Sequence, residues 1–291
     1  MKLKYLLVML AVVLMASCKT APKSDKPIIT VTIEPLKYFT ESILGDKYEV
    51  VSMVPKGTSP ETYDPTPQQL VHLAQSDAYI KIGYIGFEQN WMDKINANSP
   101  ELPIFDSSVG IDLIQAEGHH HGDHFHAGGV EPHTWNSTIN AKIMAKNILD
   151  AAIQLDSVNE EYYKANYDKL ITQIQQTEDE VRSILSNENA AKGFMIYHPA
   201  LSYFARDYGL EQISIEHEGK EPTPVHLKNL IEHSLKENIH IIFIQPEFDQ
   251  KNAEVIAEQT KSKIIKISPL SYDWEKEMLH VANSLIVPPI N

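Results

Sequence analysis

From residue 28 onward, the sequence alternates short runs rich in β-branched residues with longer amphipathic stretches of helical period. Strands that alternate with helices in this way pair in parallel, because each helix carries the chain back across a face of the sheet. The pattern therefore predicts an α/β protein built on mainly parallel sheets. The predicted strands are residues 28–33, 49–53, 78–82, 103–106, 194–197, 212–215, 239–245 and 263–267.

A long polar segment separates the two groups of strands. It contains no Gly or Pro from residue 159 to residue 189, and Tyr, Leu, Ile and Val recur along it at helical spacing. We expect one helix of about 25 to 30 residues, far longer than the ~11 to 12 residues of an average helix. The sequence thus predicts two α/β lobes, residues 27–157 and 190–291, joined by one long rigid helix within residues 158–189.

The first residues have the pattern of a secretory signal. A basic start is followed by an apolar run that is too short to span a bilayer, and then by Ala16-Ser17-Cys18. Cys18 is the only cysteine, and its position resembles the cysteine of a bacterial lipobox. We expect a signal peptide at residues 1–17, a lipid anchor on Cys18 and a tether at residues 18–26, which would hold the protein to a membrane of the cell envelope, facing the periplasm or the exterior. The alternative is a buried cysteine in an uncleaved helix.

Charge limits the choice of partners. The chain has a formal net charge of −14, which argues against binding to nucleic acid. With one cysteine, no disulfide bond within the chain can support the fold.

Side chains able to bind a metal ion follow three of the predicted strands, and a fourth lies just ahead of a predicted helix. Ligands of open α/β sheets bind beyond the carboxyl ends of the strands, and the candidates there are Glu61, His133, His198 and Glu247. Two imidazoles and two carboxylates suit a four-coordinate Zn²⁺ ion, and they suit Mn²⁺ or Fe²⁺ nearly as well. A residue in such a position can also simply cap a helix or form a hydrogen bond within its own loop.

Three segments carry a resemblance to a known family. They are residues 55–67 with Pro-Glu-Thr-Tyr-Asp-Pro-Thr-Pro, Glu131-Pro132-His133-Thr134-Trp135, and Tyr197-His198-Pro199-Ala200. In this order they resemble the metal-specific solute-binding proteins of bacterial ABC transporters, the zinc and manganese group. The resemblance implies a monomeric extracytoplasmic receptor, not an enzyme, that delivers an ion to an ABC permease and its ATPase.

The chain departs from the family pattern at two positions. Glu61 stands where the family usually has its first histidine, and Ser268 stands where it usually has an aspartate. We expect Glu247 to replace that aspartate, with Asp273 as the alternative carboxylate. His217, which also follows a predicted strand, is a reserve nitrogen ligand, although it is more readily explained as a solvated loop histidine.

Five histidines crowd into one glycine-bounded segment, residues 118–129. Because the segment has no apolar periodicity, we expect a mobile loop that gathers metal ions without forming the main site. In the family such a loop accompanies zinc-directed members, so it favours Zn²⁺ over Mn²⁺ or Fe²⁺. Its histidines are His119, His120, His121, His124 and His126.

Three alternative functions remain on sequence grounds. A zinc-dependent hydrolase would need an open zinc position and a general base, yet the sequence has neither His-Glu-x-x-His nor Gly-x-Ser-x-Gly. A manganese or iron receptor, or a surface adhesin, would use the same fold and the same site.

Overall fold

The computed structural model describes residues 26–115, 119–121, 124–126, 129–216, 221–248 and 250–287. The predicted signal peptide, Cys18 and His217 lie outside these residues. No helix in the described part of the chain is long and apolar enough to cross a membrane.

Each half of the chain forms a four-stranded parallel sheet, which confirms the predicted α/β class with two lobes. The first sheet has the order β2-β1-β3-β4 and the second the order β10-β9-β7-β8, so both have the same strand order when the second is followed from its other edge. The eight predicted strands all form, with ends within two residues of the prediction. They are β1 (Ile28–Val31), β2 (Glu49–Ser52), β3 (Ala78–Lys81), β4 (Ile104–Asp106), β7 (Gly193–Ile196), β8 (Glu211–Ser214), β9 (Ile241–Ile244) and β10 (Lys263–Lys266).

Helices connect these strands and cover the sheets. Two of them begin at a threonine followed by proline, a pattern typical of helix starts: Thr66 and Thr223 each cap a helix whose first residue is proline. The helices are α2 (Glu34–Leu44), α3 (Pro67–Leu73), α4 (Gly86–Asn98), α5 (Thr138–Leu155), the 3₁₀ turn η1 (Ser157–Asn159), α6 (Glu160–Leu185), α7 (Ser202–Tyr208), α8 (Pro224–Lys236), α9 (Lys251–Thr260) and α10 (Trp274–Ser284).

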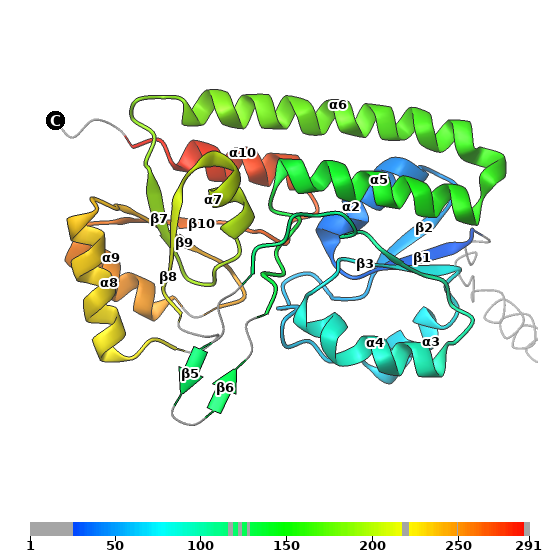
Figure 1. Cartoon of the computed structure of the whole chain (residues 1–291), viewed down its shortest axis with the longest axis horizontal. Coiled ribbons are helices and arrows are strands. Elements are labelled where there is room, and N and C mark those ends of the chain that lie inside the picture. Colours follow the sequence, from blue (N-terminus) through cyan, green and yellow to red (C-terminus); the bar gives the residue numbers. More distant parts are fainter. Residues whose placement is uncertain are drawn as a thin grey trace, which may run out of the picture.

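Helix α6 is the long helix of the sequence prediction, with 26 residues. It lies along one side of the whole molecule, where it packs against α2 and α5 of the first lobe and α10 of the second (Figure 1). Tyr163, Leu170, Ile174 and Val181 form its buried stripe. Because the same helix is packed on both lobes, it restricts how far they can move apart. The residue boundaries of the lobes remain a prediction.

The two central strands of the second sheet, β7 and β9, are buried on both faces. Successive residues of a strand point to opposite faces, so Phe194 and Phe243 join the core that is continuous with the first lobe, whereas Met195 and Ile242 pack under α8 and α9. This burial explains the near-continuous apolar runs by which the strands were predicted. The core shared between the lobes holds the loops at the carboxyl ends of the two sheets in a definite relation.

The histidine-rich segment, predicted as a mobile loop, has regular backbone pairing in its described residues. Its backbone forms an antiparallel hairpin of β5 (His119–His121) and β6 (His124–His126), above a single bridge between Gln115 and Val130. The hairpin extends away from both lobes (Figure 1). A backbone ladder needs no apolar side chains, and two residues between strands is a common hairpin length. The absence of apolar periodicity therefore does not exclude strand pairing, and the mobility of the segment stays a prediction.

Candidate metal centre

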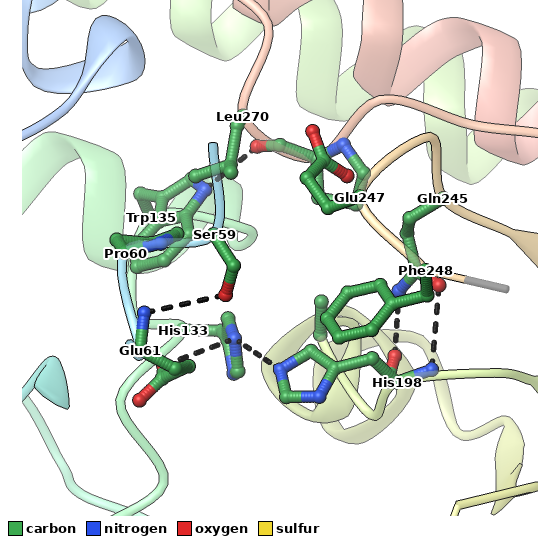
Figure 2. Close-up of a pocket in the computed structure, with 12 residues that line it drawn as sticks. Ser59, Pro60, Glu61, His133, Trp135, His198, Gln245, Glu247, Phe248 and Leu270 are labelled. Carbon is green, nitrogen blue, oxygen red and sulfur yellow. Dashed lines mark hydrogen bonds and ion pairs between the residues drawn. The ribbon is translucent and has the colours of Figure 1, made fainter. Parts of the chain in front are cut away.

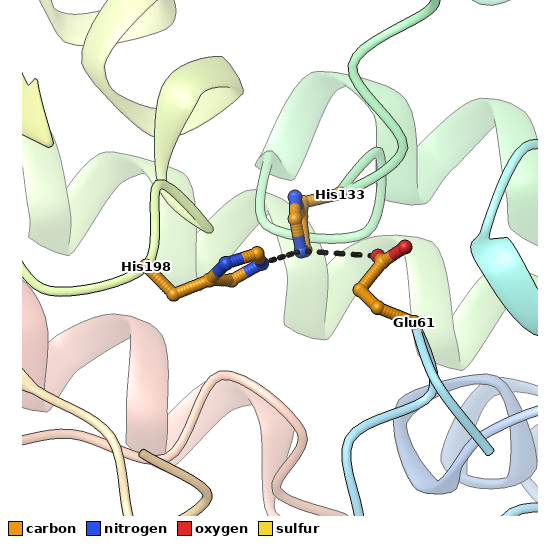
Figure 3. Close-up of side chains that lie close together, drawn as sticks. All are labelled: Glu61, His133 and His198. Carbon is orange, nitrogen blue, oxygen red and sulfur yellow. Dashed lines mark hydrogen bonds and ion pairs between the residues drawn. The ribbon is translucent and has the colours of Figure 1, made fainter. Parts of the chain in front are cut away.

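Three of the predicted metal-binding side chains meet between the lobes. One ligand atom from each of Glu61, His133 and His198 lies within 4.8 Å of the others (Figure 3). Glu61 comes from the loop after β2, His133 from the segment that leads into α5, and His198 directly follows β7. Two segments of the first lobe and one of the second thus build the group.

The carboxylate of Glu61 is held at the start of α4. Its Oε2 accepts a hydrogen bond from the backbone N–H of Gly86, the first residue of that helix, at 3.2 Å. A Cβ at position 86 would lie 2.4 Å from the carbonyl oxygen of Glu61, so this approach requires glycine. The other oxygen, Oε1, is buried without a hydrogen-bond partner and lies 3.8 Å from His133 Nε2. A buried oxygen of this kind is costly unless a cation or proton occupies the space before it.

The imidazole of His133 is 5% exposed and is fixed at its Nδ1 atom by the carboxylate of Glu131. Burial of the ring lowers the pKa of His133, but the negative charges of Glu131, Glu61 and Glu216 raise it by more, so the pKa lies above its usual value of 6.5. Burial likewise raises the pKa of Glu131, and the contact with His133 outweighs that effect, which leaves it below the usual value. The site therefore attracts positive charge.

His198 is held from three directions. Its Nδ1 atom lies 2.8 Å from Glu216 Oε1, and the ring of Phe248 stacks on the imidazole at 4.8 Å. Gln245, at the end of the neighbouring strand β9, accepts from the backbone N–H of His198 at 3.3 Å and donates to its carbonyl oxygen at 2.6 Å. Figure 2 shows His198, Gln245 and Phe248 among the residues that line the cavity. The ring consequently has little freedom to turn.

The spacing of the donors suits one small cation. The Nε2 atoms of His133 and His198 are 3.1 Å apart, close to the about 3.3 Å between two nitrogens of a tetrahedral zinc site. The adjoining cavity has a volume of about 20 Å³, which is room for one water-sized particle and far too little for a sugar or an amino acid.

The remaining candidates lie farther from this group. Glu247 lines the cavity on the side opposite Glu61 (Figure 2), and burial raises its pKa. Asp273 precedes α10 on the exposed surface and is not among the residues that line the cavity. Ser268 does not line it either, and its backbone N–H donates to Glu277 at 2.6 Å.

Sequence reasoning did not single out Glu131 and Glu216, which hold the two imidazoles. Both had a usable signal. Glu131 stands two residues before His133 in the same motif, and Glu216 follows β8 at the carboxyl edge of the second sheet, the rule by which the other candidates were chosen.

Comparison with known proteins assigns this chain to a protein family. The family model described as zinc-uptake complex component A, periplasmic, matches residues 29–285. The high-affinity zinc uptake system protein ZnuA of Bacillus subtilis is 26% identical over 250 residues, which cover 83% of this chain and 77% of that protein. The manganese ABC transporter substrate-binding lipoprotein PsaA of Streptococcus pneumoniae is 29% identical over 253 residues, 83% of this chain and 79% of that protein.

Solved structures agree with this result. A crystal structure of ZnuA superimposes with a TM-score of 0.83 and 34% sequence identity, and the match covers 90% of this chain and 98% of that one. The likeness thus extends over the fold and the sequence together.

Proposed function

Because the chain belongs to the family of periplasmic zinc-uptake complex component A proteins, a family of metal-binding substrate-binding proteins of ABC transporters and not of enzymes, we propose that its substrate is Zn²⁺. It captures one ion between its two lobes and delivers it to an ABC permease for import.

One observation carries the proposal. Glu61 Oε1, His133 Nε2 and His198 Nε2 converge from both lobes, and the carboxylate oxygen among them is buried without a hydrogen-bond partner. A divalent cation would satisfy that oxygen and both imidazole nitrogens at once. Glu247, the other carboxylate that lines the cavity, would complete the set by turning toward the ion. Two carboxylates would then balance the +2 charge of the ion, which reduces the cost of enclosing it.

The histidine-rich segment favours Zn²⁺ over Mn²⁺, because imidazole binds zinc well. The donor set by itself suits both ions, and the spacing of the two imidazole nitrogens is compatible with a tetrahedral Zn²⁺ shell. Sequence similarity does not decide the metal, since the relatives include proteins named for zinc and for manganese.

The setting of this function follows from the family and the first residues. We expect the mature chain to be a monomer, anchored by lipid on Cys18 to a membrane of the cell envelope, on the periplasmic or exterior side. There it would meet the permease, whose ATPase drives import.

Metal content and competition titration of the purified mature chain test the proposal. One tight Zn²⁺ per chain is expected, and Mn²⁺ should displace it only in large excess. His133→Ala, His198→Ala and Glu61→Ala should each weaken zinc binding by more than the about 10- to 100-fold typical of residues that only support a ligand. Ser268→Ala is the control and should bind zinc like the wild type. Unchanged stoichiometry and affinity in His198→Ala would disprove the site, and tighter binding of Mn²⁺ would disprove the choice of metal.

A further inference from the structure

Both imidazoles of the site make the same contact on the side away from the cavity. His133 Nδ1 contacts Glu131 Oε1, and His198 Nδ1 lies 2.8 Å from Glu216 Oε1. The two Nε2 atoms in turn face each other across 3.1 Å. Each histidine thus has one nitrogen on a carboxylate and the other directed into the site.

The chemistry of these contacts determines the tautomer. An ionised carboxylate only accepts hydrogen bonds, so each Nδ1 atom must carry the hydrogen and donate it. A neutral imidazole with its proton on Nδ1 has its lone pair on Nε2, which is the form that binds a metal ion. The carboxylates therefore select both the ring orientation and the donor atom.

We propose that Glu131 and Glu216 are positioning residues of the metal site, which do not touch the ion but hold His133 and His198 with Nε2 directed at it. This inference rests on the proposed function. Each glutamate acts through a hydrogen bond to the ring, which also makes Nε2 a stronger donor to the ion.

Glu131 is itself anchored from both lobes. Its Oε1 also accepts from the backbone N–H of His133 at 3.1 Å, and its Oε2 accepts from the hydroxyl of Ser202 at 3.1 Å. Its carbonyl oxygen accepts from the hydroxyl of Tyr203 at 2.9 Å. Ser202 and Tyr203 belong to α7 of the second lobe, so the residue that orients a histidine of the first lobe is fixed by the second.

Glu216 owes its place to the parallel sheet. Strands β7 and β8 are neighbours and end at the same edge, which brings Glu216 beside His198 although 18 positions separate them. Its backbone N–H donates to the carbonyl oxygen of Tyr197 at 3.1 Å, next to the histidine itself. The Glu216 side chain is 8% exposed, so water competes little for the contact with Nδ1.

Removal of either carboxylate should weaken zinc binding. Loss of a group that orients a histidine ligand typically lowers metal affinity by about 10- to 100-fold. Glutamine retains an oxygen that can accept the Nδ1–H hydrogen bond but lacks the charge, so it should restore part of the loss. If a glutamate merely supported the fold, replacement by glutamine would not give a zinc affinity between those of the wild type and the alanine variant.

The test compares Glu131→Ala, Glu131→Gln, Glu216→Ala and Glu216→Gln with the wild type and one control. Glu178→Ala is the matched control, because that carboxylate is 11% exposed and pairs with Lys142 and Arg182 on the long helices, away from the cavity. Zinc affinity is measured by competition titration. NMR of the zinc-loaded proteins, with histidine labelled by ¹⁵N, reports which nitrogen binds zinc and whether the Nδ1–H proton is hydrogen-bonded.

We expect an affinity order of wild type, then Gln variants, then Ala variants, with the last about 10- to 100-fold weaker than the first. The Nδ1–H proton of the affected histidine should exchange faster with water in each Ala variant and remain protected in each Gln variant. Alanine variants that bind zinc as tightly as Glu178→Ala, or zinc bound through Nδ1 in the wild type, would overturn the inference. If His133→Ala and His198→Ala also bind zinc normally, the proposed function itself has failed. If these two histidine variants lose zinc binding while the glutamate variants keep it, only the positioning role is wrong.

Discussion

The Nε2 atoms of His133 and His198 lie 3.1 Å apart, although the two residues are 65 positions apart and belong to different lobes. This distance is close to the about 3.3 Å expected between two nitrogens on one tetrahedral zinc ion. The two imidazoles therefore already have the spacing that a bound ion requires. Glu61, whose Oε1 is 3.8 Å from His133 Nε2, needs only a small adjustment of its side chain to join them.

We predict that zinc affinity begins to fall at a pH above 6.5. Burial lowers the pKa of His133, but Glu131, Glu61 and Glu216 raise it by more, so a proton competes with the ion at a higher pH than for an ordinary histidine. Once the pH is below that pKa, displacement of one proton costs about tenfold in affinity per pH unit. Competition titrations between about pH 8 and pH 5 measure the profile. An affinity that stays constant down to about pH 6 would contradict it.

The same pKa predicts the opposite trend for the stability of the metal-free protein. A group whose pKa is raised on folding stabilises the folded state fully below its unfolded pKa of about 6.5, and this stabilisation is lost as the pH rises through the folded pKa. The free energy of unfolding of the metal-free wild type, relative to His133→Ala, should therefore increase as the pH falls toward 6.5. Urea denaturation at a series of pH values checks the sign. A difference that does not change with pH would show that folding does not raise the pKa of His133.

Glu247→Ala should weaken zinc binding less than His133→Ala or His198→Ala. Its carboxylate lines the cavity but must turn to reach the ion, so part of its contribution is offset by that rearrangement. Asp273→Ala, on the exposed surface before α10, is the matched control and should bind like the wild type. Competition titration measures the zinc affinity of both variants. If Glu247→Ala binds normally, water or another residue holds the fourth position.

Removal of the histidine hairpin should leave one tight zinc ion in place. The bridge between Gln115 and Val130 brings the ends of the segment together, so residues 118–129 can be replaced by a short glycine linker with little disturbance of the fold. The deletion should remove weaker additional zinc equivalents, measured as total zinc bound at saturation. Loss of the tight ion would mean that the hairpin supplies one of its main ligands.

Two tyrosines should contribute to the stability of the contact between the lobes. Tyr38 of α2 donates to Glu275 of α10 at 2.5 Å, and Tyr272 donates to Glu41 of α2 at 2.6 Å. Each Tyr→Phe change should lower the free energy of unfolding by about 1 kcal/mol, the net value of a partly exposed hydrogen bond. Thermal and denaturant unfolding of each variant and of the wild type measure the effect. A double variant that is as stable as the wild type would show that these bonds do not hold the lobes together.

Cys18→Ser should release the protein from the membrane fraction. The only cysteine follows Ala16-Ser17 at the end of the apolar run, which is the position of a lipid anchor. Cell fractionation with an antibody against the mature chain measures the distribution. A variant that stays fully in the membrane fraction would show that another feature anchors the chain.

Much of the fold was predictable because its signals are local. β-branched runs mark the eight strands, and a threonine followed by proline marks the starts of α3 and α8, since each depends only on neighbouring residues. Glu61, His133 and His198 could be selected as candidates because they follow strands or precede a helix at the carboxyl edges of the sheets, and because the motifs around them resemble those of a known family. The long helix was visible in a stretch without Gly or Pro.

Only the tertiary structure decided how these candidates relate to one another. It brought Glu131 and Glu216 onto the imidazoles, left Glu247 across the cavity and Asp273 on the surface, and gave the histidine-rich backbone a strand pairing. The sequence by itself determined which residues form each element and which chemistry they carry. The distance between side chains from different elements depends on how the two lobes pack around a shared core, and that packing is a sum over contacts between residues far apart in the chain.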